Sequence, residues 1–250
     1  SAQSISITPE TTYTGSGSLT ATSGTLTISG GTEITPTGNF QASGNITLSG
    51  SGKLSLSSRT VNSTNGNISF TAGPIADEAI DISASTISTT TGSITMNGTA
   101  LSGNSDNLEG VYIYGTSTVS STSGAINITG SGASTGYGVW LGAANIISSS
   151  GAITINGGTL GLRTGDAATT NLGATSSTTS SSAITVIGDR YWNSSSSTIF
   201  KTSGNVVIEP SANLFSADTT FKNQTFTGNA SLTIGKSTNC LLYTSPSPRD

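Results

Sequence analysis

Histidine is absent from this chain of 250 residues, and cysteine occurs only once. Without histidine, the chain lacks the commonest general base of enzymes and the commonest metal ligand of proteins. A single cysteine excludes a disulfide framework within the chain and a zinc site built from thiolates. Several classes of enzyme and metalloprotein are therefore excluded before any motif is considered.

Charge is scarce as well, because only 8% of the residues are charged, about a third of the usual share. The formal net charge is −4, and the 8 Lys and Arg residues are scattered along the chain, which argues against a nucleic-acid partner. No apolar run approaches the roughly 18 residues that a membrane-spanning helix needs. We therefore expect no nucleic-acid partner and no membrane span.

Small polar residues dominate instead, since Ser, Thr, Gly and Asn make up 140 of the 250 residues. Such a composition can indicate a disordered linker. Two observations oppose disorder. Only 6 residues are proline, and the apolar residues are β-branched or aliphatic and regularly placed. The sequence therefore predicts a folded chain.

One phrase of six residues recurs: a small hydroxyl residue or Asn, Gly, any residue, an aliphatic residue, a polar residue and an apolar residue. Its alternation has a period of two, which is typical of a strand with one buried face. The Gly ahead of each strand fits a turn in which φ is positive. Clean copies lie at 23–28, 43–48, 51–56, 65–70, 91–96, 123–128, 150–155 and 203–208, and degenerate copies at 183–186 and 231–234.

The units that carry this phrase are 20 to 32 residues long. In the middle units a second strand precedes the phrase, at 79–82, 110–113 and 138–141. One unit cannot bury its apolar stripe alone, whereas stacked units bury it against their neighbours. We therefore predict an all-β fold, a parallel β-helix (β-solenoid) of about 9–10 irregular rungs of 20–32 residues. An antiparallel sandwich is the alternative, disfavoured because tight Asn-Gly or Asp-Gly hairpin turns are few.

The alternating apolar members of the phrase should point inward, with like residues stacked along the axis. They are expected to form the core. These residues are Leu26, Ile28, Ile46, Leu48, Ile68, Phe70, Ile94, Ile126, Ile128, Ile153, Ile155, Val206 and Ile208.

The middle section repeats its wording most closely. Gly-Val-Tyr-Ile at 110–113 returns as Gly-Val-Trp-Leu at 138–141, and Ser-Gly-Ala-Ile-Asn-Ile at 123–128 returns as Ser-Gly-Ala-Ile-Thr-Ile at 150–155. This section resembles the filamentous-haemagglutinin-type surface exoproteins of Gram-negative bacteria. The resemblance implies a right-handed β-helix shaft, secretion through an outer-membrane partner, a place outside the cell at its surface, and adhesion to surface glycans or to receptors on host or neighbouring cells.

The last eleven residues, 240–250, match no repeat and hold the single cysteine, Cys240. They resemble an in-frame translation of a transposon-type sequencing-library adapter, so we expect a non-native tail. The remainder, 1–239, is predicted to be a single β-helix domain cut at both ends. The chain opens at Ser1 without a recognisable secretory signal, which fits either a removed signal or an internal fragment.

The densest acidic group is Asp77, Glu78 and Asp81. Paired carboxylates can cleave polysaccharides, but no Lys or Arg lies between Arg59 and Arg163 to assist them. We expect Asp77 and Glu78 in a solvated loop, and Asp81 pointing outward because it alternates with two isoleucines. We therefore predict no catalytic residue, no metal site and no cofactor.

The aromatic residues Tyr112, Tyr114 and Trp140 cluster in two adjacent units. Because Tyr112 and Trp140 occupy the same place in their units, they should stack on one face and form, with Tyr114, a strip that could bind sugar rings. The alternative is that these rings fill the core or shield a face. Tyr191 and Trp192 stand in a different context and are expected in a loop.

These observations favour a non-catalytic structural and adhesive shaft of a secreted bacterial surface protein. One alternative, motivated by the Thr-rich strands, is a β-solenoid that binds a repeating surface such as ice or a polysaccharide. Another is a polysaccharide lyase or hydrolase on a β-helix, which the lack of charge clusters disfavours.

Overall fold

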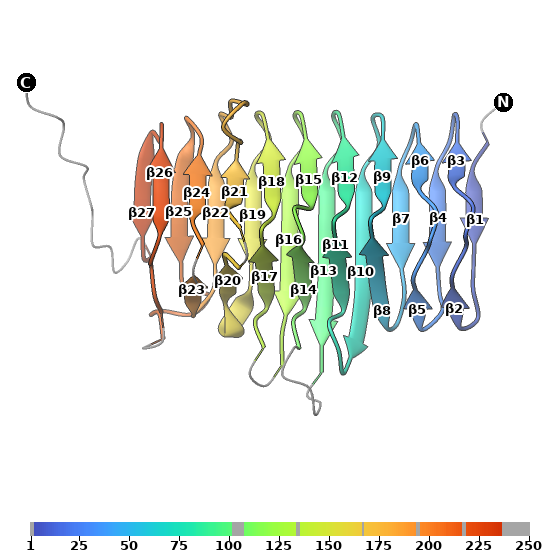
Figure 1. Ribbon diagram of the computed structural model, residues 1–250, viewed down its shortest axis with the longest axis horizontal. Helices are drawn as coiled ribbons and strands as arrows, with labels where there is room; N and C mark the ends of the chain where they lie inside the picture. The colour runs from blue at the N-terminus through green and yellow to red at the C-terminus, as the bar shows by residue number, and fades with distance from the viewer. Residues whose placement is uncertain are drawn as a thin grey trace, which may run out of the picture.

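The computed structural model describes residues 3–101, 108–133, 136–166, 168–193, 196–216 and 219–236. Residues 237–239 at the end of the expected domain and the expected non-native tail, 240–250, lie outside this part of the chain. The described chain winds into a parallel β-helix, in which each turn, here called a rung, passes in order through sheets A, B and C (Figure 1). The predicted all-β solenoid is confirmed.

Sheet A contains ten parallel strands, one from every rung. They are β1 (Ile5–Ile7), β4 (Leu26–Ser29), β7 (Ile46–Ser49), β10 (Ile68–Ile75), β13 (Ile94–Ala100), β16 (Ile126–Ser131), β19 (Ile153–Asn156), β22 (Ile184–Ile187), β25 (Asn205–Glu209) and β27 (Ser231–Ile234). The repeated phrase forms nine of these strands, all except β1. The copy at 51–56 forms part of a sheet B strand.

Sheets B and C contain eight and nine strands. Sheet B consists of β2 (Thr12–Tyr13), β5 (Glu33–Ile34), β8 (Lys53–Ser57), β11 (Ile80–Ser83), β14 (Val111–Tyr114), β17 (Val139–Gly142), β20 (Leu162–Thr164) and β23 (Tyr191–Asn193). Sheet C consists of β3 (Leu19–Ala21), β6 (Phe40–Ala42), β9 (Thr60–Ser63), β12 (Thr86–Thr89), β15 (Thr118–Ser121), β18 (Asn145–Ser148), β21 (Thr170–Gly173), β24 (Thr198–Lys201) and β26 (Gln224–Thr227). The second strand expected in each middle unit therefore belongs to sheet B, and the aliphatic residues Ile87, Val119 and Ile146 that follow it lie in sheet C.

The core consists of files of apolar side chains that run along the axis. In sheet A, Ile68 is in register with Ile94, which is in register with Ile126. All thirteen residues predicted to point inward are at most 1% exposed. Burial of each aliphatic side chain stabilises the fold by about 1.5–3 kcal/mol. The apolar pair that recurs in each sheet A strand therefore favours stacking of one rung on the next.

The glycine of the repeated phrase is required by close approach between rungs. A Cβ atom on Gly92 would collide with the backbone of Gly66, and one on Gly124 would collide with that of Gly92. The hydroxyl of Ser121 joins the same rungs, because it accepts a hydrogen bond from Gly124 N–H at 2.9 Å and donates one to the Gly92 carbonyl at 3.0 Å. Positive φ occurs at other glycines, such as Gly30. The expected positive φ at the phrase glycines is therefore wrong.

Helix is nearly absent from the described ranges, which contain only the short 3-10 helix η1 (Gly158–Leu160). No helix among these residues has the length and apolar character needed to cross a bilayer.

Candidate functional site on the outer face of sheet B

One outward file of sheet B contains acidic, aromatic and cationic side chains on consecutive rungs. Alternate residues of the sheet B strands point into the core, so the residues between them point outward. Register pairs place the outward residues of consecutive rungs next to one another. The file reads Ser55, Asp81, Tyr112, Trp140, Arg163, Trp192.

The three aromatic residues singled out in the sequence meet in this file. The rings of Tyr112 and Trp140 are stacked with centroids 4.4 Å apart, and Tyr114 stacks on Tyr112 at 4.2 Å. Trp140 is 8% exposed, and both tyrosines are partly exposed. The expected vertical stacking of Tyr112 on Trp140 is confirmed.

An arginine that sequence reasoning missed extends the stack. The guanidinium carbon of Arg163 lies 3.5 Å from the Trp140 ring centroid and 4.7 Å from that of Trp192. Gly161-Leu162-Arg163 repeats the Gly-aliphatic-X pattern of Gly110-Val111-Tyr112, which is the signal that could have found it. A planar cation between two indoles is favourable because each ring face carries negative potential.

The expectation that Tyr191 and Trp192 lie in a loop is wrong. Both belong to β23, where Tyr191 is 1% exposed and Trp192 points outward. The ring of Trp192 also stacks on Tyr137 with centroids 6.3 Å apart, and the Arg190 guanidinium carbon lies 4.1 Å from the Tyr137 ring centroid. The aromatic and cationic surface therefore reaches two rungs beyond the predicted strip.

This stacking decides which parts of the rings are available. Tyr112 contacts Tyr114 and Trp140, while Trp140 contacts Tyr112 and Arg163. The ring faces of Tyr112 and Trp140 are thus used within the protein, and Tyr114 uses one face against Tyr112.

Buried polar atoms without a hydrogen-bond partner concentrate on the same face. Five of the seven such atoms among the described residues are Asp81 Oδ1, Glu109 Oε2, Trp140 Nε1, Arg163 Nε and Arg190 Nε. Unpaired buried polar groups are costly and rare in native proteins, so their concentration here sets this face apart from the other two. The outer face of sheet B is therefore the candidate functional site.

A lysine from the preceding rung contacts the acidic group at one end of this face. Lys53 Nζ lies 3.0 Å from Asp77 Oδ2, 3.1 Å from Glu78 Oε2 and 3.7 Å from Asp81 Oδ2. Asp77 and Glu78 lie in the loop between β10 and β11 and are partly exposed, as expected. The contact with Lys53 was not expected. The contact could not be predicted from the sequence, because Lys53 and the carboxylates are far apart in the chain and β8 and β11 become neighbours only when the rungs stack. Asp81 points outward, as expected.

The ionisation of this group follows from its contacts. Burial lowers the pKa of Lys53, but hydrogen bonds to Asp77 and Glu78 outweigh it and raise that pKa to about 12. Burial raises the pKa of Asp81, and Lys53 opposes that rise. Three carboxylates around one ammonium form an ionic cluster. No group of three or more acidic, Cys or His side chains suited to a metal ion occurs within the described ranges.

Glu109 is a further residue that sequence reasoning missed. It is 2% exposed, and burial raises its pKa to about 7, with a further rise from the charge of Glu78. The Arg163 charge and the backbone N–H of Tyr137 act in the opposite direction. Glu109 stands two residues before the first residue of β14. Glu78, one rung earlier, stands at the same place before β11. A buried carboxyl beside an aromatic stack is thus held close to its titration midpoint at neutral pH.

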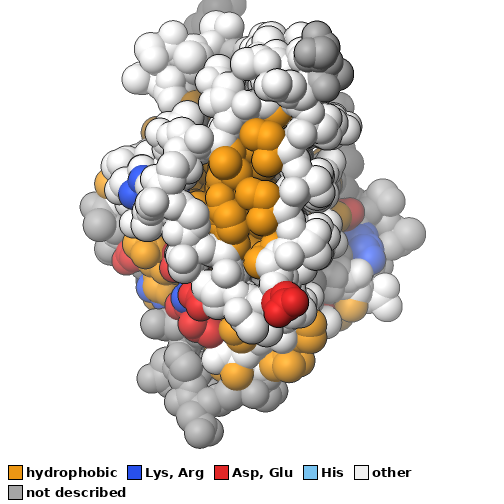
Figure 2. Space-filling model, turned by 90° about the vertical axis from the view of Figure 1, so that its right-hand side faces the viewer, with side chains coloured by type: hydrophobic (Ala, Val, Ile, Leu, Met, Phe, Trp, Pro, Cys, Tyr) orange, Lys and Arg blue, Asp and Glu red, His pale blue; other side chains and the backbone are white. Residues whose placement is uncertain are grey.

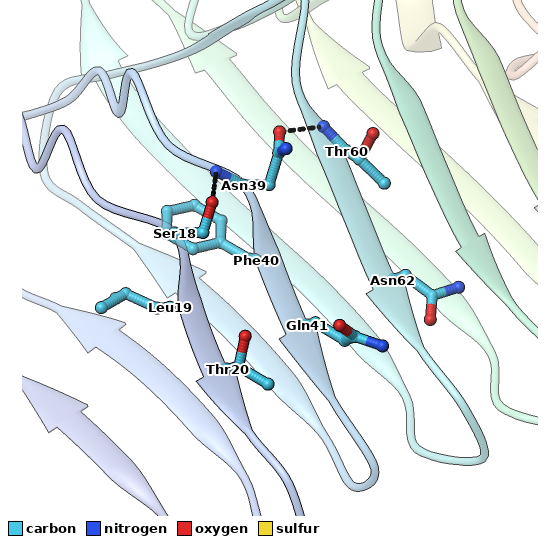
Figure 3. A pocket seen from close by; sticks show the side chains of 8 residues that line it. All are labelled: Ser18, Leu19, Thr20, Asn39, Phe40, Gln41, Thr60 and Asn62. Carbon is cyan, nitrogen blue, oxygen red and sulfur yellow. Dashed lines mark hydrogen bonds between the residues drawn. The ribbon is translucent and has the colours of Figure 1, made fainter.

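A second, uncharged surface lies on the outer side of sheet C (Figure 3). There a groove of about 430 Å³ is lined by side chains of three successive rungs. Asn39 N–H donates to Ser18 Oγ at 3.4 Å, and Asn39 Oδ1 accepts from Thr60 N–H at 2.9 Å. The lining residues are Ser18, Leu19, Thr20, Asn39, Phe40, Gln41, Thr60 and Asn62.

The outer face of sheet A is uncharged over most of its length. Its central file holds threonine at six of ten positions, and the register is continuous from end to end. The lysine of the phrase copy at 51–56 does not interrupt it, because that copy lies in sheet B. The file reads Ser6, Thr27, Thr47, Ser69, Thr95, Asn127, Thr154, Thr185, Val207, Thr233.

Comparison of the chain with protein-family models, with curated proteins and with solved structures finds no match. The chemistry of the three outer faces is therefore the basis on which a function is proposed.

Proposed function

We propose that this chain is a non-catalytic, structural and adhesive shaft segment of a secreted bacterial surface protein, and that its outer faces bind neutral glycans. The observation that carries the proposal is the continuous parallel β-helix with in-register files of hydroxyl and amide groups on its outside. The resemblance of residues 110–158 to filamentous-haemagglutinin-type exoproteins supports a place on the surface of a Gram-negative bacterium, reached with an outer-membrane secretion partner.

The outer faces suit saccharides because hydroxyl and amide groups both donate and accept hydrogen bonds, as sugar hydroxyls do. In the sheet C groove, Thr20, Gln41 and Asn62 stand side by side on consecutive strands (Figure 3). Rungs repeat about every 4.8 Å, so a glycan chain lying along the axis meets the same groups repeatedly. Each exposed contact is weak, and useful adhesion comes from many rungs that act together.

On sheet B, the aromatic strip of Tyr112, Tyr114 and Trp140 would contribute through its edges. The hydroxyls of the partly exposed Tyr112 and Tyr114 are polar groups set beside apolar ring edges, a combination that suits the mixed surface of a sugar. A sugar would not stack on the faces of Tyr112 and Trp140, because neighbouring rings and Arg163 already contact them.

A glycan array probed with the full chain tests the proposal. We expect weak binding to neutral glycans that increases strongly when the chain is displayed in many copies. The double variant Gln41→Ala/Asn62→Ala should lower binding if the sheet C groove contributes, and Tyr112→Ala/Tyr114→Ala should do so if the strip contributes. Thr95→Ala on sheet A, away from both surfaces, is the control. Absence of binding in the multivalent format would contradict the adhesive part of the proposal.

The non-catalytic part is tested by release of reducing sugars from the glycans that bind. We expect no release. Release that is abolished by Asp81→Asn would reject the shaft and favour a glycoside-cleaving enzyme.

A second candidate function is binding to an ordered surface, either ice or a crystalline polysaccharide. The threonine-rich file of sheet A favours it, because evenly spaced like groups match a periodic surface. Inhibition of ice recrystallisation by the full chain, lost in Thr47→Lys/Thr95→Lys and retained in Asn62→Lys on sheet C, would support it. An inactive parent chain would reject the ice-binding form.

A further inference from the structure

Arg163 is a cation on the outer face of sheet B whose hydrogen-bonding capacity is unused within the described chain. A guanidinium has five N–H donors, and no oxygen atom of the described residues accepts a hydrogen bond from Arg163. No salt bridge among these residues involves it either. Other cations differ, since Lys53 contacts carboxylates, and Arg59 and Lys201 donate to backbone carbonyls.

Stacking fixes the orientation of the Arg163 guanidinium and leaves its edge available. Trp140 and Trp192, from the rungs on either side, lie against it with ring centroids 3.5 and 4.7 Å from its central carbon. The N–H groups lie in the plane of the guanidinium and so point away from both rings. Arg163 is partly exposed, and Nε is its single nitrogen among the buried atoms without a partner. Its two Nη atoms are therefore open to an acceptor from outside.

Arg190, which directly precedes β23, is a second cation of this kind. It is partly exposed, and its one hydrogen bond in the described chain runs from Nη2 to the Gly136 carbonyl at 3.2 Å. Its guanidinium carbon lies 4.1 Å from the Tyr137 ring centroid, and Tyr137 stacks on Trp192. Arg163, Trp192, Tyr137 and Arg190 thus form a row of cation, ring, ring and cation, here called the arginine row.

Charged side chains are exceptions on this molecule. Figure 2, a view along the axis, shows that uncharged polar atoms make up most of the visible surface around the apolar core. The arginine row has two acidic neighbours, because Glu109 and Asp166 act on the Tyr112 hydroxyl together with Arg163. No described salt bridge joins either of them to Arg163.

The acidic groups still leave the arginine row attractive to an anion. Burial holds the pKa of Glu109 at about 7, so this carboxyl carries only part of a full negative charge at neutral pH. Asp81 and its acidic neighbours lie three rungs before Arg163 in the same file. An anion on this face therefore meets unused cations at one end and carboxylates at the other.

We propose that the arginine row binds a polysaccharide that carries carboxylate groups, namely a chain of uronic acids. A carboxylate matches the planar fork of a guanidinium and forms two parallel hydrogen bonds with it. One small anion does not contact both arginines, because Trp192 and Tyr137 lie between them. A polymer with recurring carboxylates reaches both, and the apolar edges of its sugars pack beside the two rings. This site goes beyond the neutral glycans proposed above and does not depend on them.

Tryptophan fluorescence tests the site directly, since the chain has two tryptophans and both contact Arg163. Titration of the full chain with polygalacturonate at low salt should change the emission until it saturates. Dextran, a neutral polysaccharide, should leave the emission unchanged. The affinity for polygalacturonate should fall as salt is added, because exposed ionic contacts are screened.

Variants of the two arginines provide the second test, with binding to immobilised polygalacturonate as the readout. Arg163→Gln and Arg190→Gln should each weaken binding about tenfold or more, the scale of a hydrogen bond to a charged group. Arg59→Gln/Lys201→Gln removes two positive charges outside the row and should keep the affinity of the parent chain. Circular dichroism checks the fold of each variant. Arg190→Gln leaves the stack of Arg163 between its two indoles in place, so it decides the outcome if Arg163→Gln is misfolded.

Binding at the arginine row and neutral-glycan binding in the sheet C groove can fail independently. Gln41→Ala/Asn62→Ala, which tests the groove, should retain full affinity for polygalacturonate. Loss of affinity in that variant would place the binding on sheet C and overturn the assignment to the arginine row.

Three further results would reject the proposal. The first is a parent chain with no affinity for polygalacturonate at low salt. The second is an equal loss of affinity in Arg59→Gln/Lys201→Gln, which would indicate attraction by net charge alone. The third is equal or tighter binding of polyglutamate or dextran sulfate, which would show that the row does not select a carboxylated sugar.

Discussion

The guanidinium of Arg163 lies over the ring of Trp140, 3.5 Å from its centroid, although 22 residues separate them in the chain. The pair exists because β17 and β20 are neighbouring strands with Trp140 and Arg163 in register. Trp192 follows on the next rung and also contacts Arg163, at 4.7 Å. A single cation thus links the aromatic residues of the two rungs on either side of it.

Removal of that cation should loosen the outer face of sheet B. We expect Arg163→Ala to lower the free energy of unfolding by about 1–2 kcal/mol, because a partly desolvated cation–π contact contributes on that scale. Arg163→Lys should recover only part of the loss, since a compact ammonium does not lie flat between two rings. Urea unfolding followed by tryptophan fluorescence measures both.

Arg59→Ala provides the matched control for this variant. Arg59 bonds backbone carbonyls of Ser57 and Thr37, so its removal should leave the fluorescence of the folded state unchanged. A folded-state spectrum that is the same for the parent chain and for Arg163→Ala would contradict the stacked arrangement.

Glu109 should make stability depend on pH between about 4.5 and 7. Its pKa is raised by burial from the ordinary glutamate value of 4.5 to about 7. The folded state therefore holds a proton that the unfolded state has lost in this window, so stability is highest below pH 4.5 and falls as pH rises towards 7. The loss attributable to this group is on the order of 3 kcal/mol at most.

Glu109→Gln removes the titration and keeps the size of the side chain. We expect this variant to be more stable than the parent at pH 8 and equal to it near pH 4, in thermal melts recorded across the range. Glu33→Gln, on the partly exposed β5, is the control. A parent and a Glu109→Gln variant with parallel pH profiles would show that Glu109 does not titrate in this range.

Replacement of Lys53 by methionine should expose the repulsion within the acidic cluster. At pH 7 we expect a destabilisation of about 1.5–3 kcal/mol, the scale of a hydrogen bond to a charged group. The loss should shrink at pH 4, because protonated carboxyls no longer repel one another. Lys201→Met is the control, because the Lys201 ammonium bonds only backbone carbonyls, those of Thr175 and Ser176, among the contacts described. Its loss of unfolding free energy should be the same at the two pH values.

The corner glycines should tolerate no side chain. Gly124→Ala places a methyl group against the backbone of Gly92, and we expect a destabilisation of more than about 2 kcal/mol. Gly17→Ala meets open space and should be neutral or stabilising by up to about 1 kcal/mol. Equal melting temperatures for the two variants would refute the close packing of the corners.

Period-two alternation and the recurrence of Gly in one phrase were enough to predict the β-helix and its core. Ile126 and Ile128 are apolar residues two positions apart, and that spacing alone places both on one face of a strand. The stacking of Tyr112 on Trp140 was also predictable, because both follow a Gly-Val pair in consecutive units. These inferences concern residues that are close in the chain or that repeat one local pattern.

The tertiary structure alone decided which distant residues share an outward file. Lys53 reaches Asp77 and Glu78, and Arg163 reaches Trp192, only because rungs of unequal length close with a defined register. The sequence determines which side of a strand each residue faces, since that alternation is a property of the local backbone. Register between rungs depends on how each corner packs, as Gly92 and Gly124 show, and corner packing is a contact between segments more than twenty residues apart.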